Sequence, residues 1–428
     1  MITTTWAILW IPTAGGAAAG FGPDPDDEHA AVTAVAAATT TNAAVLQRRI
    51  HSIAGLTKPS HELARSIAPG AETSPMTRKS WLAAAGAGMA VSLVAACSSS
   101  TAPVHPATAG TGAGPGAGIH KIAHVVVIMQ ENRSFDTYFG TYPGADGIPM
   151  ANGQPTVCVP DGAGHCVKPF HDGRDVNGGG PHGQTNATAD INGGKMDGFV
   201  TQAQRGRQGC ADPNNPACTN SAVPDVMGWK DAREIPNYWA YAQNYILQDH
   251  MFEPNASWSL PQHLFMVSEW SAHCTTPGDA SSCANALQSP GTPKSDAEGD
   301  PIAAAAKPDY AWTDLTYLMH RDNVGWGYYV VTGTEPDCQN PSAVSCAPVK
   351  QNAKTPGIWN PLPYFDTVRQ DGQQGNIQSV DNFYAQAKAG TLPAVSWVVP
   401  SGPVSEHPPA ATSAGQAYVT SLINAVMA

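Results

Sequence analysis

A short β-branched run that ends in two polar side chains is the feature that most constrains the fold of this 428-residue chain. Residues 125–129 read Val-Val-Val-Ile-Met, which is too short for a membrane span and typical of a strand buried on both faces. Glu131 and Asn132 follow at its carboxyl end, where open α/β sheets bind their ligands. A carboxylate oxygen beside an amide oxygen suits a hard divalent cation.

The residues that follow predict a short helix, because Ser134 can cap its first turn and Gly140 can end it. The string from His124 to Gly140, continued to Gly147, resembles the opening motif of the bacterial phosphoesterase family that contains the non-haemolytic phospholipases C and related acid phosphatases. This resemblance implies that Glu131 and Asn132 bind a catalytic divalent metal ion of unknown identity. It also implies that Asn132 contacts the phosphoryl group of the substrate.

The composition of the first quarter differs sharply from that of the rest. Residues 1–75 are rich in Ala and Thr, and we expect them to be disordered or a misassigned upstream region. Residues 76–97 combine a basic start, a short apolar stretch and small residues before Cys97, which predicts a lipoprotein-type signal with Cys97 lipidated. A transmembrane anchor is the alternative, for which the apolar stretch is short. Residues 77–82 also resemble a twin-arginine signal with one Lys, so the export route stays open.

Residues 98–118, rich in Ser, Thr, Pro and Gly, predict a flexible linker, and residues 119–428 predict the phosphoesterase domain. The formal net charge of −12 and the lack of basic clusters argue against nucleic acid as a partner. The expected partners are a phospholipid or small phosphoester substrate and a membrane reached through the lipid anchor.

Apart from Cys97, the cysteines fall into four close pairs that bracket loop-forming residues. We expect four local disulfides, although sequence alone does not fix the connectivity. Zinc is the competing interpretation, but no pair has the C-x-x-C spacing. Disulfides predict an exported protein of the cell envelope or the extracellular space. The pairs are Cys158 with Cys166, Cys210 with Cys218, Cys274 with Cys283, and Cys338 with Cys346.

Segments with strand and helix character alternate in the main domain. Residues 325–331 and 394–399 read as strands, and residues 381–390 read as a capped helix. An apolar stripe from Ile235 to Ile246 has helical spacing and is expected in the core. The pattern predicts an α/β fold with a central, mostly parallel sheet and long disulfide-stapled loops. The family resemblance implies an alkaline phosphatase/sulfatase-like sandwich.

A serine near a second predicted helix is a candidate nucleophile. Pro261 suits a first helical turn, which places Ser259 at a helix N-terminus, where free N–H groups favour bound phosphate. Ser257 is a rival on position alone. The family carries its nucleophilic Ser or Thr two residues before a Pro, so the resemblance selects Ser259 as catalytic residue and metal ligand. We assign no catalytic role to His263.

Two histidines lie in segments that resemble family motifs. His182 lies in Gly-Pro-His-Gly-Gln, and His407 lies in Ser-Glu-His-Pro-Pro after the strand at 394–399. The resemblance implies that they contact phosphate oxygens or protonate the leaving alcohol. Imidazole is well suited to proton transfer near neutral pH.

The family completes its metal site with an Asp pair after the helix that here begins at Ala417, and the sequence contains no such segment. We interpret the chain as C-terminally truncated. Because only one carboxylate would bind the metal ion, we expect little or no turnover from the truncated chain. We expect metal-dependent turnover from a chain that is extended through the Asp pair.

The function expected is phosphoester hydrolysis by a metal-activated Ser259, most simply by a phospholipase C acting on phosphodiesters such as phosphatidylcholine. The alternatives are a broad acid phosphatase and a non-catalytic surface lipoprotein that binds phosphorylated ligands.

Overall fold

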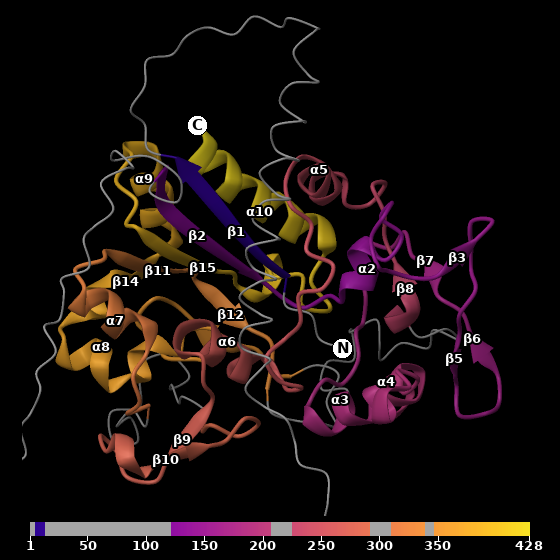
Figure 1. Ribbon diagram of the computed structural model, residues 1–428, viewed down its shortest axis with the longest axis horizontal. Helices are drawn as coiled ribbons and strands as arrows, with labels where there is room; N and C mark the ends of the chain where they lie inside the picture. Colours follow the sequence, from indigo (N-terminus) through magenta and orange to yellow (C-terminus); the bar gives the residue numbers. More distant parts are fainter. Residues whose placement is uncertain (1–4, 13–120, 207–224, 292–309, 339–345) are drawn as a thin grey trace, which may run out of the picture. The chain divides into compact units, whose positions relative to one another are not determined.

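The computed structural model describes residues 5–12, 121–206, 225–291, 310–338 and 346–428. These segments belong to one compact unit. Figure 1 shows its central sheet with helices on both faces.

The central sheet in this part of the chain has five strands in the order β1-β2-β15-β11-β14. Strands β2, β15, β11 and β14 are parallel, and β1 pairs antiparallel with β2 at one edge. The predicted α/β fold with a mostly parallel sheet is therefore confirmed. The strands span Thr5–Pro12 (β1), Ile122–Gln130 (β2), Trp326–Val330 (β11), Ile377–Ser379 (β14) and Val395–Val399 (β15).

Alternate residues of the inner strands pack in two separate hydrophobic cores, because successive side chains in a strand point to opposite faces of the sheet. Val127 and Met129 of β2 pack in a core with Leu260 and Leu264 of the helix Ser259–Ser268. Val126 and its neighbours pack in the other core with residues of helices that are described below. Strands buried on both faces explain the continuous apolar runs in the sequence.

Helices cover both faces of the sheet (Figure 1). Residues of α9 and α10 belong to one core, and residues of α6 and α8 belong to the other. The helices span Phe135–Phe139 (α2), Gln184–Ile191 (α3), Phe199–Gly206 (α4), Pro236–Asn244 (α5), Ser259–Ser268 (α6), Leu315–Arg321 (α7), Asp366–Gln370 (α8), Val380–Ala389 (α9) and Thr412–Met427 (α10).

Five short strand pairs lie in the described segments that connect the main helices and strands. Four of them are antiparallel, and β7 with β8 is parallel. They are Met150–Ala151 (β3) with Gln154–Pro155 (β4), Val159–Pro160 (β5) with Cys166–Val167 (β6), Phe170–His171 (β7) with Gly228–Trp229 (β8), Ala272–Cys274 (β9) with Cys283–Asn285 (β10), and Gly333–Glu335 (β12) with Val349–Gln351 (β13).

Several predicted element ends match the structure. Ser134 caps α2 by accepting a hydrogen bond from the backbone N–H of Thr137, and Gly140 follows its last residue. One part of the core prediction is wrong. Tyr245 and Ile246 are 56% and 87% exposed, because α5 ends at Asn244 and the chain leaves the helix there.

Residues 5–12, which lie in the segment expected to be disordered or a misassigned upstream region, form β1. The run Thr-Trp-Ala-Ile-Leu-Trp-Ile-Pro has strand-forming composition and pairs with the free edge of β2. The rest of 1–75, the signal at 76–97 with Cys97, and the whole linker at 98–118 lie outside the described residues. The proposed domain division therefore stays a prediction.

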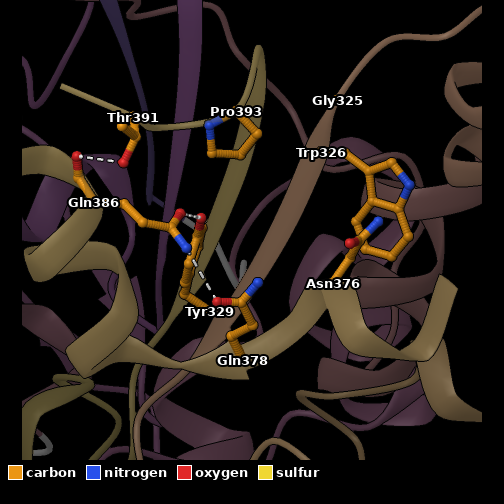
Figure 2. Close-up of a pocket in the computed structure, with 8 residues that line it drawn as sticks. All are labelled: Gly325, Trp326, Tyr329, Asn376, Gln378, Gln386, Thr391 and Pro393. Carbon is orange, nitrogen blue, oxygen red and sulfur yellow. Dashed lines mark hydrogen bonds between the residues drawn. The ribbon is translucent and has the colours of Figure 1, made fainter. Parts of the chain in front are cut away.

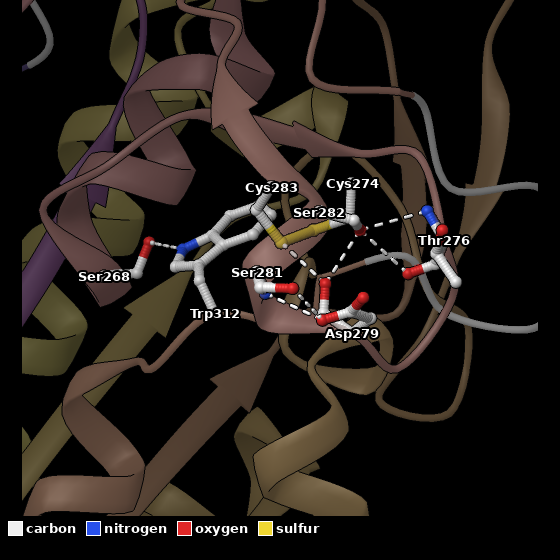
Figure 3. The surroundings of a disulfide bond; sticks show 8 residues. All are labelled: Ser268, Cys274, Thr276, Asp279, Ser281, Ser282, Cys283 and Trp312. Atoms are coloured by element: carbon white, nitrogen blue, oxygen red, sulfur yellow. Dashed lines mark hydrogen bonds between the residues drawn. A yellow bond between two sulfur atoms is a disulfide. The ribbon is translucent and has the colours of Figure 1, made fainter. Parts of the chain in front are cut away.

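Three of the four expected local disulfides are present: Cys158–Cys166, Cys274–Cys283 and Cys338–Cys346. Figure 3 shows Cys274–Cys283 joining β9 to β10, with Asp279 and Ser282 hydrogen-bonded within the loop. Cys210 and Cys218 lie outside the described residues. Local disulfides are typical of an oxidising compartment. None of the helices in the described segments combines the length and apolar character that crossing a membrane requires.

Candidate active site

The carboxyl ends of three adjacent parallel strands supply the polar centre of the site. Glu131 directly follows β2, His407 lies in the segment after β15, and Asp337 lies in the segment after β11. Because β15 pairs with both β2 and β11, these segments leave the sheet side by side. Ligand sites in α/β sheets form at this edge.

Ser259 is the first residue of α6 and lies against two of these carboxylates. Its Oγ–H donates to Glu131 Oε2 over 2.5 Å, and its backbone N–H donates to Asp337 Oδ2 over 3.0 Å. All three residues are at most 4% exposed. The rival Ser257 is equally buried, but its Oγ makes no hydrogen bond to the described residues. The geometry therefore favours Ser259.

His182 pairs with Asp337 through a 2.7 Å contact between Nε2 and Oδ1. Its Nδ1 faces the carbonyl of Gly180 at 3.0 Å. Burial would lower the pKa of His182, but the charge of Asp337 and their hydrogen bond outweigh burial and raise the pKa to about 9. Burial would raise the pKa of Asp337, but His182 holds that pKa well below its usual range. His182 is therefore an imidazolium at neutral pH.

His407 lies beside His182, with ring centroids 5.4 Å apart. Its Nδ1 is 2.9 Å from the carbonyl of Pro408, which can only accept, so Nδ1 carries the proton. Burial lowers the pKa of His407, against the opposing charge of Asp337. The ring is therefore neutral at neutral pH, and Nε2 carries a lone pair. That atom is buried without a hydrogen-bond partner among the described residues.

His263 lies in the centre of the site, although we assigned it no catalytic role from the sequence. It is fully buried, and its Nε2 lies 2.9 Å from Glu131 Oε1. Its ring stacks on Trp359 at a centroid distance of 6.3 Å. The missed signal is its position four residues after Ser259, since i and i+4 share one face of a helix. The two oxygens of Glu131 therefore face His263 and Ser259 separately.

Asp337 was also missed in the sequence. It lies two residues after β12 and directly before Cys338, whose backbone N–H donates to Asp337 Oδ1 over 2.7 Å. The Cys338–Cys346 disulfide starts at that neighbour. An acidic residue between a strand and a disulfide near the carboxyl edge was the available signal. Its partners His182 and Ser259 become visible only in three dimensions.

A model of the phosphoesterase family matches residues 122–428. The chain belongs to the phosphoesterase family.

Curated relatives are phospholipases C. The chain is 25% identical over 337 residues to the non-hemolytic phospholipase C of Burkholderia pseudomallei, covering 72% of this chain and 41% of that protein. It is 25% identical over 313 residues to phospholipase C A of Mycobacterium tuberculosis, covering 69% and 53%. For the non-hemolytic phospholipase C of Pseudomonas aeruginosa the identity is 24% over 326 residues, covering 72% and 39%. The chain thus spans roughly half the length of these relatives or less.

The donor atoms of this phosphoesterase site fit a divalent metal ion. Ligand atoms of Asp337 and His407 lie within 4.8 Å of each other, beside the protonated His182. Glu131 joins them through Ser259, which bonds both carboxylates. The buried, unpartnered Nε2 of His407 is a donor atom that the protein itself leaves unused. Imidazole and carboxylate together suit first-row divalent ions.

Asn132 is half-buried directly after Glu131. The expected metal shell of Glu131, Asn132 and Ser259 contained one carboxylate, and the structure adds Asp337 as a second next to Ser259. The expectation of little or no turnover from this chain was based on a single carboxylate and did not count Asp337.

Glu406 is a buried carboxyl group directly before His407 in the sequence. It accepts hydrogen bonds from Tyr138, over 2.6 Å, and from Tyr238. Burial raises the pKa of Glu406 to about 7, against the opposing effect of the two tyrosine hydroxyls. Glu131 and Glu406 form an isolated parallel bridge, so the backbone before His407 is held beside the end of β2.

The described surface also contains a pocket of about 360 Å³ at the other end of the sheet (Figure 2). It lies where β11 begins and is lined by Trp326, Tyr329, Gln386 and Pro393 among others. None of the candidate active-site residues lines it, so it carries no part of the proposed chemistry.

Proposed function

We propose that this chain is a phospholipase C type phosphoesterase that hydrolyses phosphodiesters such as phosphatidylcholine with Ser259 as nucleophile. The single observation that carries the proposal is the position of Ser259, at a helix N-terminus between two carboxylates at the carboxyl edge of the sheet. The relatives' printed names support the phosphodiester class.

In the proposed reaction Ser259 Oγ attacks phosphorus and forms a phosphoseryl intermediate. Glu131 Oε2 already accepts a hydrogen bond from the Ser259 hydroxyl and is placed to take its proton. His263 fixes the other oxygen of Glu131, which keeps Oε2 directed at the nucleophile. The positive end of the α6 dipole favours the charge of a bound phosphate.

His182 would protonate the leaving alcohol, because Asp337 keeps it protonated at neutral pH. His182, left neutral by that transfer, would accept a proton from the water that hydrolyses the phosphoserine, which restores its starting state. The two histidines thus have opposite proton states, set by their different partners: His182 would transfer protons, and the neutral Nε2 of His407 would bind the cation.

A divalent cation would be held by Glu131, Asn132, Ser259, Asp337 and His407. When bound, it would supply Lewis-acid polarisation of the phosphoryl group and lower the pKa of the Ser259 hydroxyl.

The proposal includes an alkaline phosphatase/sulfatase-like sandwich, which the mostly parallel sheet between two helical layers supports. It also includes export, with a lipid on Cys97 anchoring residues 119–428 to the cell envelope. The disulfides support export, and the anchor rests on the sequence signal alone.

The test compares the Ser259→Ala and Ser257→Ala variants of the full chain on a chromogenic phosphocholine ester and a chromogenic phosphomonoester. Each substitution removes one buried hydroxyl, so Ser257→Ala is a matched control. We expect chelator-sensitive diester hydrolysis that falls by about 10³-fold or more in Ser259→Ala and little in Ser257→Ala. Preference for the monoester would favour an acid phosphatase. Phosphocholine binding without turnover in the unmodified chain would favour a phospholigand-binding protein.

A further inference from the structure

A second group of metal-ligand side chains lies outside the active site. It comprises His171 at the end of β7, and Asp231 and Glu234 in the turn before α5. Their ligand atoms lie within 4.8 Å of one another. His171 Nε2 and Glu234 Oε2 are 2.9 Å apart, a separation that two ligands of one metal ion can have.

Interactions with the backbone and a neighbouring ring hold these donors in place. β7 pairs with β8, and Figure 1 shows the two strands side by side. The ring of His171 packs on Trp229 with centroids 4.8 Å apart. The backbone N–H of Asp231 donates to Glu234 Oε2 over 3.2 Å, and Gln416 of α10 donates to the Glu234 carbonyl over 3.3 Å. The site is therefore preorganised.

The solvent exposure of the three side chains permits ion entry. The side chains of His171, Glu234 and Asp231 are 28%, 17% and 19% exposed. Glu234 Oε1 makes no hydrogen bond to the described residues, so one carboxylate oxygen is uncommitted. One imidazole and two carboxylates, with room for water, resemble the three-ligand open sites that bind zinc.

Arg233 is the internal competitor for this site. Its guanidinium donates to both oxygens of Asp231, over 2.7 to 3.1 Å. The Arg233 side chain is 62% exposed, and exposed ion pairs contribute little to stability. A divalent ion can therefore displace Arg233 from Asp231 at small cost.

We propose that His171, Asp231 and Glu234 form a second divalent-cation site, suited to Zn²⁺, that joins β7 to the turn before α5. The chain from β7 continues through Asp172 to His182. Asp172 is buried and accepts hydrogen bonds from Arg174 and Asn177. Zn²⁺ at His171 would therefore brace the start of the segment that carries His182, without contacting the substrate.

The test counts bound Zn²⁺ in the full chain carrying Glu131→Gln, which removes a proposed ligand of the active-site metal. Protein freed of metal by a chelator is titrated with Zn²⁺ against a chromogenic chelator. We expect one tight equivalent in this background. His171→Ala and Glu234→Gln should each weaken it by about tenfold or more. His165→Ala is the matched control, because His165 pairs with Asp161 alone on the surface and should leave binding unchanged.

Glu234→Gln keeps the shape of the side chain, so it replaces His171→Ala if that variant fails to fold. Circular dichroism checks that the fold of each variant is intact. Arg233→Ala should tighten Zn²⁺ binding about two- to fivefold by releasing Asp231. Unchanged or weaker binding in Arg233→Ala would overturn the assignment of Asp231. Absence of a tight equivalent, or equal affinity in His171→Ala and His165→Ala, would overturn the site. The experiment measures Zn²⁺ binding and not hydrolysis, so its outcome does not test the role of Ser259 as nucleophile.

Discussion

Ser259 and Glu131 are 128 positions apart in the sequence, yet the hydroxyl of one donates to the carboxylate of the other over 2.5 Å. The parallel sheet places the end of β2 at the ligand-binding edge, and α6 starts at the same edge. The nucleophile and its carboxylate therefore come from two elements whose ends both lie at this edge.

The contact of His263 with Glu131 predicts a positioning role. In His263→Phe, Glu131 Oε1 loses its only hydrogen-bond partner among the described residues, while the aromatic stacking on Trp359 is retained. We expect metal affinity to fall about 10- to 100-fold. His263→Gln, whose amide can donate, should recover part of the loss. Calorimetric titration with Mn²⁺ measures both variants, and equal affinity in His263→Phe and the unmodified chain would contradict the role.

The His182–Asp337 pair predicts a specific pH dependence of stability. The pKa of His182 rises from 6.5 to about 9 on folding, so its contribution is fully present below pH 6.5 and is lost as pH rises through 9. The loss should be up to roughly 3 kcal/mol. Urea unfolding of chelator-treated protein at several pH values measures it. His182→Gln should flatten this slope, and an unchanged slope would show that another group titrates.

Local sequence patterns predict part of the candidate site, and the rest depends on contacts across the fold. The strand before Glu131, the cap at Ser134 and the helix starting near Ser259 follow from local patterns of apolar, capping and turn residues. Asp337 and His263 acquire their roles only through contacts made across the fold, which local patterns do not encode. The exposure of Tyr245 and Ile246 shows the same limit, since apolar spacing does not reveal where a helix ends.

The two tyrosines on Glu406 predict a second pH effect. The pKa of Glu406 rises from 4.5 to about 7 on folding, so its contribution is present below pH 4.5 and is lost as pH rises through 7. Tyr238→Phe removes a hydrogen bond that favours the ionised form and should make this loss larger, by about 1–3 kcal/mol at pH 8. Tyr241→Phe is the control, because Tyr241 bonds Thr420 instead. Equal pH profiles for the two variants would contradict the assignment.

The disulfide pattern predicts that Cys210 pairs with Cys218. Peptide mapping of the non-reduced, exported protein should recover this pair together with Cys158–Cys166, Cys274–Cys283 and Cys338–Cys346. Removing Cys274–Cys283 by a double change to Ala should lower the free energy of unfolding by about 2–3 kcal/mol, as expected for a short closed loop. Cross-pairing of Cys210 with a distant cysteine, or a free thiol at that position, would contradict the pattern.

Trapping the phosphoryl enzyme tests the role of Ser259 most directly. The full chain is mixed with a chromogenic phosphocholine ester and divalent metal, quenched in acid within the first turnovers, digested and analysed by mass spectrometry. We predict one phosphoryl group on Ser259, absent in Ser259→Ala and present in Ser257→Ala. Phosphoryl transfer to a different residue, or turnover without any phosphoserine under conditions that trap it in a control phosphatase, would contradict the assignment of Ser259.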